Sequence, residues 1–556
     1  MTPLRRKAIL AVLLGLCSGL QVHAQSANAS LTGRITDASK AVVAGAKVIV
    51  INRSTRIRYE SFTNQTGSYY VTNLPPGTYR IEAERLGFKA VIKSDVILHV
   101  QDTLEINFEM ELGSASESVT VQGGAPLLDT ESSTIGTVVE QRKANELPLN
   151  GRNVFNLIEL VASVVPQGSS TGTPVGVNPF GWGNYQVNGS FGNQSAEYLD
   201  GQPLNIGYIN LPVLIPTQDS IQEFRVQTSN LGPEWGKFSG GVTNLSTKSG
   251  TNSLHGEAYE YVRNKIFNAN DFFLNAVGKS RPPWVQNQFG ANAGGPVNFS
   301  RNRGRNRTFW FFSWEGFRLR TGQPFTATVP DAKERIGDFS EICKSGFAGG
   351  ICNDRQTDTN GKSVVINQIY DPCAGSVNAQ GACPGSTATP TPFASNIIPV
   401  GRINLTSAKL LNLWPVPNKA SASTNNFTTV ANTGGDQNQV VWRLDHNLKN
   451  RQRFFFRFSY WNVLDLPIDP LGSGLCADRC SENYHSSAMA AGYSHAFTPT
   501  VIFGFNVSVS RFRYNRSPKN SGFDLTTIGW PASYNQSVPA VMRTPPRRAS
   551  RISPIT

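Results

Sequence analysis

Cysteine is the residue type in this chain whose number and spacing point most directly to chemistry, either metal binding or covalent cross-linking. Six of the seven cysteines fall as close pairs in stretches rich in Gly, Asn and Asp: Cys343 with Cys352, Cys373 with Cys383, and Cys476 with Cys480. In the loops of an exported chain such pairs are typical of disulfides. Zinc is the alternative, but no His lies at ligand spacing beside any pair. We predict disulfides with a preference for neighbour pairing, leave the connectivity open, and predict no metal site.

Carboxylates offer a second chemistry, that of a hydrolase. Asp200, Glu223 and Glu234 could act as paired acids, but no His or nucleophile is positioned with them. The Asp-Gly pair at Asp200 is typical of a turn. Glu223 and Arg225 alternate with apolar residues, so we expect them to face a water-filled lumen. No zinc-protease signature occurs, and the sequence predicts no catalytic residue, no cofactor and no enzyme.

The chain is basic, with 51 Lys and Arg against 38 Asp and Glu, which gives a net charge of +13. Charged residues make up only 16% of the sequence, and the basic ones are scattered among aromatics. A nucleic-acid-binding protein needs a clustered basic patch or a recognition motif, and the sequence contains neither. We therefore expect no nucleic-acid partner.

The first 24 residues have the pattern of a signal peptide. A basic stretch at 5–7 precedes an apolar run over 8–20, with a small-residue cleavage site before Gln25. Cys17 raises the alternative of a lipoprotein, but the bulky Leu16 before it does not fit lipoprotein cleavage. No later stretch reaches the length of a transmembrane helix. A membrane-inserted form of the mature chain would therefore have to be a β-barrel.

Residues 25–112 contain short alternating segments separated by turn signals. Small and branched residues alternate over 44–50, and a Pro-Pro-Gly at 75–77 fixes a turn before alternation resumes at 78–81. Several short strands at this spacing predict a small β-sandwich with an Ig-like or prealbumin-like arrangement. The turn motifs resemble the carboxypeptidase regulatory-like domain over the whole unit. This resemblance implies a non-catalytic appendage.

Residues 125–252 carry a series of turn and strand motifs. A turn that begins a helix at 146–155 is followed by a turn at 198–203 and a strand at 221–226. The motif residues that we single out are Leu147, Pro148, Asn150, Gly151, Arg152, Asp200 and Gly201. In this order the motifs resemble the plug domain of a TonB-dependent receptor, specifically the Oar-like branch with a regulatory-like domain in front. The resemblance implies an α+β globule that fills the lumen of a large barrel.

The segment between these two units, 113–124, is a linker of small residues. Its centre is the extended stretch Glu117, Ser118, Val119, Thr120 and Val121. In a TonB-dependent receptor a segment at this place would be the TonB box, which offers an edge strand to the periplasmic energiser. Any exposed strand has the same pattern, so an ordinary linker strand is the alternative.

A Gly-rich junction at 240–252 separates two kinds of sequence. Before it lie units with Gly- and Asn-rich turns, and after it come aromatic-rich β segments separated by long polar loops. The junction's glycines allow sharp turns, and its Ser, Thr and Asn side chains can satisfy free backbone groups. We interpret it as the last strand of a plug handing over to the first strand of a membrane barrel.

Period-2 alternation indicates barrel strands within 253–536. Over 501–510 the odd positions are Val or Phe and the even ones are mainly Gly, Asn or Ser, so one face suits lipid and the other a polar lumen. Aromatic residues share one face over 453–460, and over 442–448 Trp and Leu oppose charged and amide residues. The alternative is a soluble β-sandwich core, which shows the same alternation. We expect the polar insertion 331–438 to be an extracellular loop.

The length of this last region does not fit a complete receptor. A barrel of this class has about 22 strands, and each strand with its connection takes roughly 20–30 residues. On that scale 253–536 supplies only about ten strands, and the basic, Pro-rich tail 537–556 shows no alternation. We therefore expect an incomplete antiparallel barrel in a C-terminally truncated receptor. An open barrel would expose unpaired strand edges, so whether the chain forms a barrel alone stays open.

The resemblance as a whole implies a mainly β outer-membrane receptor that takes up a bulky ligand, which would be a saccharide, a peptide or a metal chelate. Its partners would be the TonB energy-transducing complex, outer-membrane lipid and an unidentified extracellular ligand. The chain would be exported to the outer membrane of a Gram-negative-type cell, with its N-terminal domain in the periplasm. The alternatives are an outer-membrane adhesion protein and a secreted carbohydrate-binding β protein.

Overall fold

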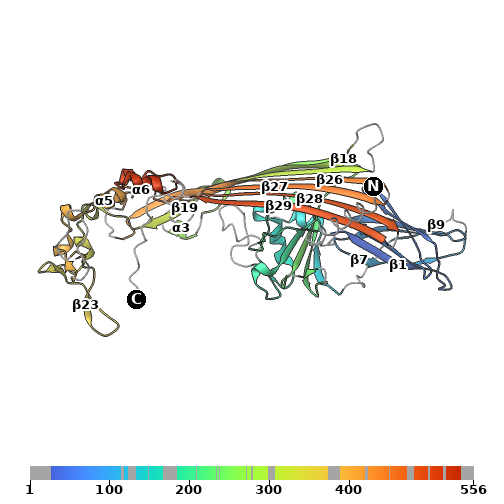
Figure 1. Ribbon diagram of the computed structural model, residues 1–556, viewed down its shortest axis with the longest axis horizontal. Coiled ribbons are helices and arrows are strands. Elements are labelled where there is room, and N and C mark those ends of the chain that lie inside the picture. The colour runs from blue at the N-terminus through green and yellow to red at the C-terminus, as the bar shows by residue number, and fades with distance from the viewer. Residues whose placement is uncertain are drawn as a thin grey trace, which may run out of the picture.

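The structure is a computed structural model that describes residues 27–539 with internal gaps. The gaps are 114–117, 123–132, 148, 167–184, 208, 233–234, 237, 271, 277, 279, 298–306, 374–388, 420–423, 450, 467, 472–480, 499–500 and 518–520. The predicted signal peptide and most of the basic tail lie outside the described residues. The chain forms an N-terminal domain, a middle domain and a long sheet. The middle domain lies against one face of this sheet, close to the N-terminal domain, and a loop region lies at the sheet's opposite end (Figure 1).

The N-terminal domain, 27–122, has two sheets around one core. One sheet has the order β4-β1-β7, with β8 also paired to β1, and the other has the order β3-β2-β5-β6-β9. The strands are β1 (Ala29–Asp37), β2 (Lys47–Asn52), β3 (Arg58–Phe62), β4 (Ser68–Leu74), β5 (Gly77–Glu84), β6 (Ala90–Leu98), β7 (Thr103–Glu105), β8 (Phe108–Met110) and β9 (Ser118–Gln122). Alternate side chains point inward along each strand, and Leu31, Val48 and Ile81 are fully buried in the shared core. The predicted small β domain is confirmed.

The middle domain, 133–250, is built on a mixed sheet with the order β10-β15-β16-β13-β14. Its strands are β10 (Ile135–Val139), β11 (Val164–Pro166), β12 (Tyr185–Val187), β13 (Ala196–Leu199), β14 (Gln202–Pro203), β15 (Ile221–Ser229) and β16 (Val242–Thr247). Short helices connect them: α2 (Gln141–Glu146), η1 (Asn150–Arg152), η2 (Val154–Leu160), η3 (Gly192–Gln194) and η4 (Gln218–Ser220). Phe155 and Leu157 of η2 are buried in one core with Phe224 and Leu245 of the sheet. This core fixes η1, and with it Arg152, at the surface that meets the long sheet.

The long sheet has seven antiparallel strands in sequence order. They are β17 (His255–Asn264), β18 (Trp284–Pro296), β19 (Thr308–Ala327), β26 (Phe427–Lys449), β27 (Gln452–Leu466), β28 (Ser481–Thr498) and β29 (Val501–Ser517). The prediction of about ten strands was too high for the described residues. The estimate assumed strands and connections of ordinary length, whereas β26 alone has 23 residues and the loop between β19 and β26 is long.

Alternation sorts the side chains of the long sheet onto two faces. In β27 every second residue from Arg457 to Asp465 is buried on the face toward the middle domain. On the other face Met489 of β28 is 50% exposed and Phe505 of β29 is 55% exposed. The predicted two-faced pattern is confirmed, because polar and apolar positions alternate in register across neighbouring strands.

The loop region, 328–426, connects β19 to β26 through short elements. They are α4 (Ala332–Arg335), η7 (Ser340–Ile342), β20 (Phe347–Ala348), β21 (Ile351–Cys352), β22 (Arg355–Thr357), β23 (Ser363–Val365), β24 (Tyr370–Asp371), β25 (Thr391–Pro392), η8 (Ala394–Asn396), η9 (Val400–Arg402) and α5 (Leu405–Leu411). The predicted insertion 331–438 extends too far, because 427–438 belongs to β26. Elsewhere short helices occur at η6 (Lys265–Phe267), α3 (Phe272–Ala276), η10 (Leu525–Ile528) and α6 (Ala532–Ser537). In the part of the chain that the structure describes, no helix combines the length and the apolar character needed to cross a membrane.

The junction at 240–252 joins the middle domain to the long sheet, as predicted. Strand β16 ends at Thr247 and β17 begins at His255. Between them Gly250 approaches the long sheet so closely that a Cβ would lie 2.3 Å from the carbonyl oxygen of Trp310. Only glycine fits such a close backbone approach.

Candidate functional site

The face of the long sheet that meets the middle domain carries buried charged side chains, including Arg443, Asp445, Arg457 and Asp465. Arg443 of β26 and Arg457 of β27 are register partners, so their side chains emerge beside each other. Both are buried, at 6% and 2% exposure. Like charges that lie opposite each other on paired strands are destabilising. Burying these two guanidinium groups therefore requires an anion between them.

Asp200 of the middle domain supplies this anion. One carboxylate oxygen lies 2.9 Å from Arg443 Nη1, and the other lies 2.6 Å from Arg457 Nη1. The backbone N–H and the hydroxyl of Thr247 also donate to this carboxylate, at 2.9 and 2.8 Å. Asp445 extends this group of ion pairs, because it pairs with Arg443 and Arg453. We call these residues together the Asp200 cluster: Asp200, Thr247, Arg443, Asp445, Arg453 and Arg457.

Local backbone geometry holds Asp200 in place. Asp200 and Gly201 both have positive φ, at 53° and 76°, in a turn after β13. Burial alone would raise the pKa of Asp200, but Arg443, Arg457 and the Thr247 donors outweigh it and hold this pKa below its usual value. The carboxylate is therefore ionised. The predicted turn is present, whereas the ion pairs made by Asp200 were not predicted.

Arg152 forms a second contact between the middle domain and the long sheet. Its Nε lies 2.9 Å from a carboxylate oxygen of Glu315 in β19, and its Nη2 lies 2.7 Å from Asp219 Oδ1 of the middle domain. Tyr259 of β17 donates its hydroxyl to Glu315 at 2.7 Å, and the Arg152 guanidinium lies 4.6 Å from the centre of that ring. The three charged side chains are at most 9% exposed. We call Arg152, Asp219, Tyr259 and Glu315 the Arg152 cluster.

The predicted motif around 147–152 positions Arg152 for this contact. Asn150 begins η1, in which Gly151 adopts a φ of 77° and Arg152 a φ of 51°. Such a left-handed turn costs glycine little, and it points the following chain into the η2 core. Leu147 is 37% exposed, and Pro148 lies outside the described residues.

A third contact joins the N-terminal domain to the middle domain. The turn 99–102 follows β6 and meets strands β15 and β16. Its polar contacts are His99 Nδ1 with Glu223 at 2.9 Å, Arg225 with Asp102 at 3.0 Å, and Asn244 with Gln101 at 2.8 Å. We call these six residues the N-terminal clamp: His99, Gln101, Asp102, Glu223, Arg225 and Asn244. The clamp holds the end of β6 against the centre of the middle sheet.

The prediction that Glu223 and Arg225 face a water-filled lumen was wrong. Both side chains are only 8% exposed, because the N-terminal domain covers them. The alternation along β15 was real, but it gave no information about which surface would cover its polar face. That surface comes from a turn more than a hundred residues away in the sequence.

Two groups near these contacts have pKa values displaced by their surroundings. The hydrogen bond to Glu223 raises the pKa of His99, and burial partly opposes this shift. In β13, burial raises the pKa of Glu197 to about 8, opposed by a hydrogen bond from the Asn205 amide at 2.6 Å. The N-terminal clamp and the middle domain therefore each contain a group that is sensitive to pH near neutrality.

The predicted TonB-box stretch lies in β9, at the edge of a sheet of the N-terminal domain. Its backbone from Ser118 pairs in parallel with β6, and Val119 is 39% exposed. Glu117 lies outside the described residues, while the backbone of Thr120 and Val121 belongs to the strand. In the order of that sheet, β9 is the last described strand.

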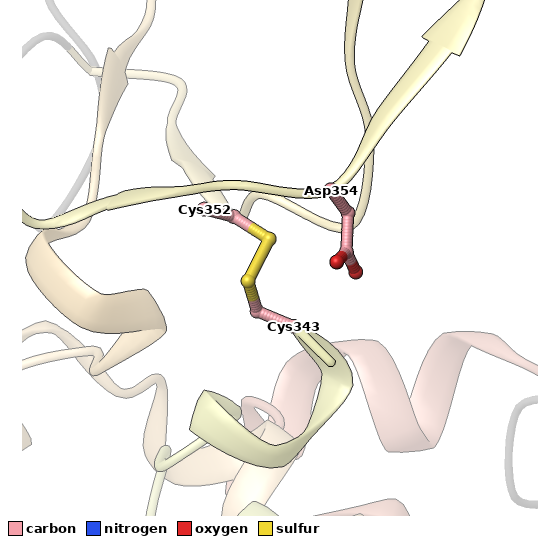
Figure 2. Close-up of side chains that lie close together, drawn as sticks. All are labelled: Cys343, Cys352 and Asp354. Carbon is pink, nitrogen blue, oxygen red and sulfur yellow. A yellow bond between two sulfur atoms is a disulfide. The ribbon is translucent and has the colours of Figure 1, made fainter. Parts of the chain in front are cut away.

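The predicted cysteine pairing is confirmed where the structure describes both partners. Cys343, which follows η7, and Cys352 of β21 form a disulfide, and Figure 2 shows Asp354 beside it. Cys373 is also disulfide-bonded, whereas Cys383, Cys476 and Cys480 lie outside the described residues. The bonded sulfurs of Cys343 and Cys352 are not thiolate ligands, and Asp354 accepts a hydrogen bond from Asn367 at 2.8 Å. The Cys343–Cys352 disulfide and the hydrogen-bonded Asp354 beside it stabilise the loop region.

A cavity of about 610 Å³ opens where the three parts of the chain meet. The N-terminal domain contributes Tyr59, the end of β16 contributes Thr247, and the long sheet contributes Arg453, Phe455 and Tyr493. Arg443 and Asp445 of the Asp200 cluster also line it. The lining mixes charged, amide and aromatic side chains, so the cavity offers both polar groups and apolar surface.

Sequence reasoning missed the partners of both clusters on the long sheet. Arg457 lies between Phe456 and Phe458, and Glu315 follows Trp314. A lone charge inside an aromatic strand was the signal available, because such a charge is buried only where a counter-ion meets it. The identity of the counter-ion could not be found this way.

The fold and these joints define a class of protein. The chain belongs to the outer membrane beta barrel domain family, whose model matches residues 246–550. The carboxypeptidase regulatory-like domain matches residues 30–111. Both matches fit the predicted resemblance, and the family implies a place in the outer membrane.

Among individual proteins, the chain is similar to the TonB-dependent transporter Oar of Myxococcus xanthus, with 27% identity over 326 residues. This alignment covers 55% of the present chain and 28% of that transporter, so the chain spans less than a third of its relative's length. Among solved structures it is similar to the outer membrane transporter YddB from Escherichia coli, with a TM-score of 0.36 and 9% identity over 67% of this chain and 38% of that one. The siderophore receptor PirA from Acinetobacter baumannii gives a TM-score of 0.36 and 13% identity over 69% and 40% of the two chains.

Proposed function

We propose that this protein takes up a bulky ligand across the outer membrane and that the middle domain is its plug. The long sheet would form part of the barrel wall, and the loop region would face the cell exterior. An inner-membrane energiser of the TonB type would supply the work. The protein itself then needs no catalytic residue and no cofactor.

The observation that carries this proposal is the way the middle domain is attached to the long sheet. The Asp200 cluster and the Arg152 cluster both place one partner on the middle domain and another on the sheet, with side chains that are nearly inaccessible to water. Buried ion pairs fix geometry strongly, because removing one partner leaves an uncompensated charge. They are also reversible, since each separated charge can be hydrated when the interface opens. A plug domain that closes a barrel and later moves needs contacts that both fix its geometry and can be reversed.

The volume of the cavity and its mixed polar and apolar lining support the ligand classes that we propose. The cavity of about 610 Å³ beside the Asp200 cluster has charged, amide and aromatic side chains. Such a lining suits a hydrated saccharide, a peptide or a metal chelate, which make hydrogen bonds and stack on aromatic rings. We keep all three classes as substrates to be tested.

Uptake measurements in cells test the proposal. Cells that carry the protein in their outer membrane would be offered three radiolabelled probes separately: a maltooligosaccharide, an oligopeptide and ferric citrate. We expect accumulation of one probe in cells with an active TonB complex and none in otherwise identical cells without TonB. Equal accumulation in both strains, or accumulation of no probe, would contradict the proposal.

The adhesion alternative makes a different prediction for the same cells. The disulfide-stapled loop region lies at the far end of the long sheet from the N-terminal domain (Figure 1), which is where an adhesion surface would be expected. An adhesion protein would bind cells or matrix to the same extent with and without TonB, and would accumulate no probe. A secreted protein would be absent from isolated outer membranes.

A further inference from the structure

The cavity where the three parts of the chain meet is lined by residues whose polar atoms are not all paired. The Tyr59 hydroxyl, from β3, and Arg453 Nη1, from β27, are buried, and neither has a hydrogen-bond partner among the described residues. Both residues line the cavity. Because a buried donor without a partner costs free energy, a ligand with acceptor atoms would be stabilised beside these two groups.

The charge balance of the Asp200 cluster indicates which kind of acceptor fits. The cluster contains three guanidinium groups but two carboxylates, so it carries one excess positive charge. Asp445 pairs with Arg453 through Nη2, at 2.8 Å, which leaves Nη1 unpaired. The Arg453 side chain is only 12% exposed. A positive charge that is buried and incompletely compensated favours a nearby anion.

A carboxylate fits this excess better than a phosphate does. One negative charge balances it, whereas a phosphate monoester carries about two negative charges at neutral pH. Asp200 and Asp445 also line the cavity, and they would repel the second charge. The Tyr59 hydroxyl remains a donor across the ordinary pH range, because burial raises the pKa of Tyr59 above its usual value.

The other walls of the cavity suit the uncharged part of such a molecule. The long sheet contributes the aromatic rings of Phe455 and Tyr493, and the N-terminal domain contributes the amides of Asn52 and Asn73. Aromatic faces pack against flat apolar surface, and amides can both donate and accept hydrogen bonds. The volume of about 610 Å³ lies within the range of roughly 300–1,000 Å³ that is typical of small-molecule sites.

The N-terminal domain completes this cavity and is fixed beside it. The Asn252 side-chain amide donates to the Thr55 carbonyl oxygen at 2.6 Å, and the Asn252 backbone N–H donates to the Ser54 carbonyl oxygen at 3.2 Å. Ser54 and Thr55 lie between β2 and β3, shortly before Tyr59. The N-terminal domain, and with it this cavity, lies away from the loop region at the opposite end of the long sheet (Figure 1).

We propose that this cavity binds a small molecule that carries a carboxylate. The carboxylate accepts hydrogen bonds from Arg453 Nη1 and the Tyr59 hydroxyl, and the aromatic and amide walls hold the uncharged part of the molecule. An acidic saccharide and the free C-terminus of a short peptide both supply this chemistry. Binding needs no energiser, so it goes beyond the proposed transport function and is tested separately from it.

Isothermal titration calorimetry with the whole protein in detergent tests the site. One pair of probes is the methyl glycoside of galacturonate and the methyl ester of the same sugar. The other pair is an N-acetylated tripeptide with a free or an amidated C-terminus, so each pair differs in a single negative charge. We expect one acid to bind and its neutral counterpart to bind roughly tenfold more weakly or less.

The two pairs of probes also distinguish the sources of the carboxylate. Binding of the sugar acid alone would assign the site to an acidic saccharide, and binding of the peptide acid alone would assign it to a peptide C-terminus. Binding of neither acid, or equal binding of the acid and the neutral form in both pairs, would overturn the proposal. Neither result depends on whether the cells show TonB-dependent uptake.

Tyr59→Phe tests one of the two donors with little risk to folding, because it removes the hydroxyl and keeps the ring. We expect it to weaken binding of the acid about tenfold. Tyr370→Phe makes the same change in β24 of the loop region, outside the residues that line the cavity, and should leave binding unchanged. Equal affinities of the unmodified protein and the Tyr59→Phe variant would overturn the assignment of this donor.

Arg453→Gln provides a measurement that a merely structural role would not change. The variant leaves two guanidinium groups with two carboxylates in the cluster, so the excess charge is gone. We therefore expect the preference for the acid over its neutral counterpart to disappear. Arg142→Gln, which removes an exposed arginine of the middle domain, should keep the preference. A folded Arg453→Gln protein with its full preference for the acid would overturn the proposal, and if this variant does not fold, Tyr59→Phe decides.

Discussion

The middle domain is attached to its two neighbours by contacts of different kinds. Toward the long sheet it uses guanidinium–carboxylate pairs whose charged atoms are buried, with Arg457 at 2% and Glu315 at 1% exposure. Toward the N-terminal domain it uses the N-terminal clamp, in which the His99 side chain remains 28% exposed. The arginines of the first attachment keep their charge across the ordinary pH range, because arginine does not lose its proton. The second contains an imidazole that does.

This difference indicates that the attachment to the long sheet withstands separation better than the attachment to the N-terminal domain does. A buried arginine with two carboxylate partners has no alternative solvation, so the long-sheet joints remain closed until the whole interface moves. In the N-terminal clamp the His99 side chain is partly exposed to water, whereas Glu223, Arg225 and Asp102 are at most 11% exposed, and the clamp depends partly on protonation of His99. We infer that the N-terminal domain can change its hold on the middle domain without any movement at the Asp200 cluster. The following four experiments test this comparison, starting with the largest expected effect.

Removing the anion of the Asp200 cluster should be the most damaging change. Asp200→Asn leaves the buried Arg457 without its carboxylate partner and leaves Arg443 with Asp445 alone, and we expect a loss of about 3–5 kcal/mol in the free energy of unfolding. The measurement is the urea midpoint of the purified protein in detergent. Glu109→Gln on the N-terminal domain, which removes an exposed ion pair with Lys40, is the control and should leave the midpoint unchanged. Equal effects of the two changes would mean that burial at Asp200 is unimportant.

A charge-conserving change should weaken the Arg152 cluster less. Arg152→Lys keeps one positive charge but cannot reach Asp219 and Glu315 in the same bidentate way, and it loses the planar stacking on Tyr259. We expect a loss of about 1–3 kcal/mol, measured as the same urea midpoint. A variant as stable as the unmodified protein would show that a point charge alone is sufficient at this position.

A change in the N-terminal clamp should have a smaller effect than either of the two changes above. The Val100 N–H donates a hydrogen bond to the Glu223 carboxylate. Glu223→Gln removes the charge that pairs with His99 while keeping an acceptor for this N–H, and we expect the docking of the N-terminal domain to weaken by about 1–2 kcal/mol. Hydrogen exchange of 99–102 should become faster, while exchange around Arg443 and Arg457 should not change. Faster exchange in both places would mean that the two attachments are coupled, contrary to the comparison.

The smallest effect should come from pH alone. The pKa of His99 is raised in the folded protein above the ordinary value of 6.5, so its contribution is fully present below that value and is lost as pH rises through the folded pKa. Docking of the N-terminal domain should therefore be tighter at pH 6 than at pH 8. Glu197 titrates in the same window, with a pKa of about 8, so the comparison is best made in a Glu197→Gln background. Glu223, Asp102 and Glu140 are the acids whose charges act on His99, and His99→Gln should abolish the pH dependence of exchange at 99–102.

Local patterns were sufficient to predict much of the architecture. The Pro-Pro-Gly turn before β5, the Gly-rich junction before β17 and the alternation along β29 each encode a short-range property, either a backbone conformation or a side-chain period. The close spacing of Cys343 and Cys352 likewise predicts a bond within one short segment of the loop region. Properties of this range depend on a few neighbouring residues, so they can be read without knowing the rest of the fold.

Strand count and loop boundaries were predicted less well for a related reason. Pairing of β19 with β26 across the whole loop region extends β26 to Phe427, inside a stretch whose Gly, Asn and Thr content is typical of a loop. The partner strand stabilises an extended conformation that the local sequence does not favour. Tertiary pairing overrides weak β propensity in such segments.

The sequence by itself determined the alternating faces, the turns and the order of the units, because these depend on residue type and period. It also showed that single charges such as Arg457 and Glu315 occur within aromatic strands. Only the tertiary structure decided that Asp200 neutralises two arginines of the long sheet, and that the N-terminal domain covers Glu223. A buried charge is stable only beside its partner, and which partner arrives depends on packing between segments that lie hundreds of residues apart in the chain.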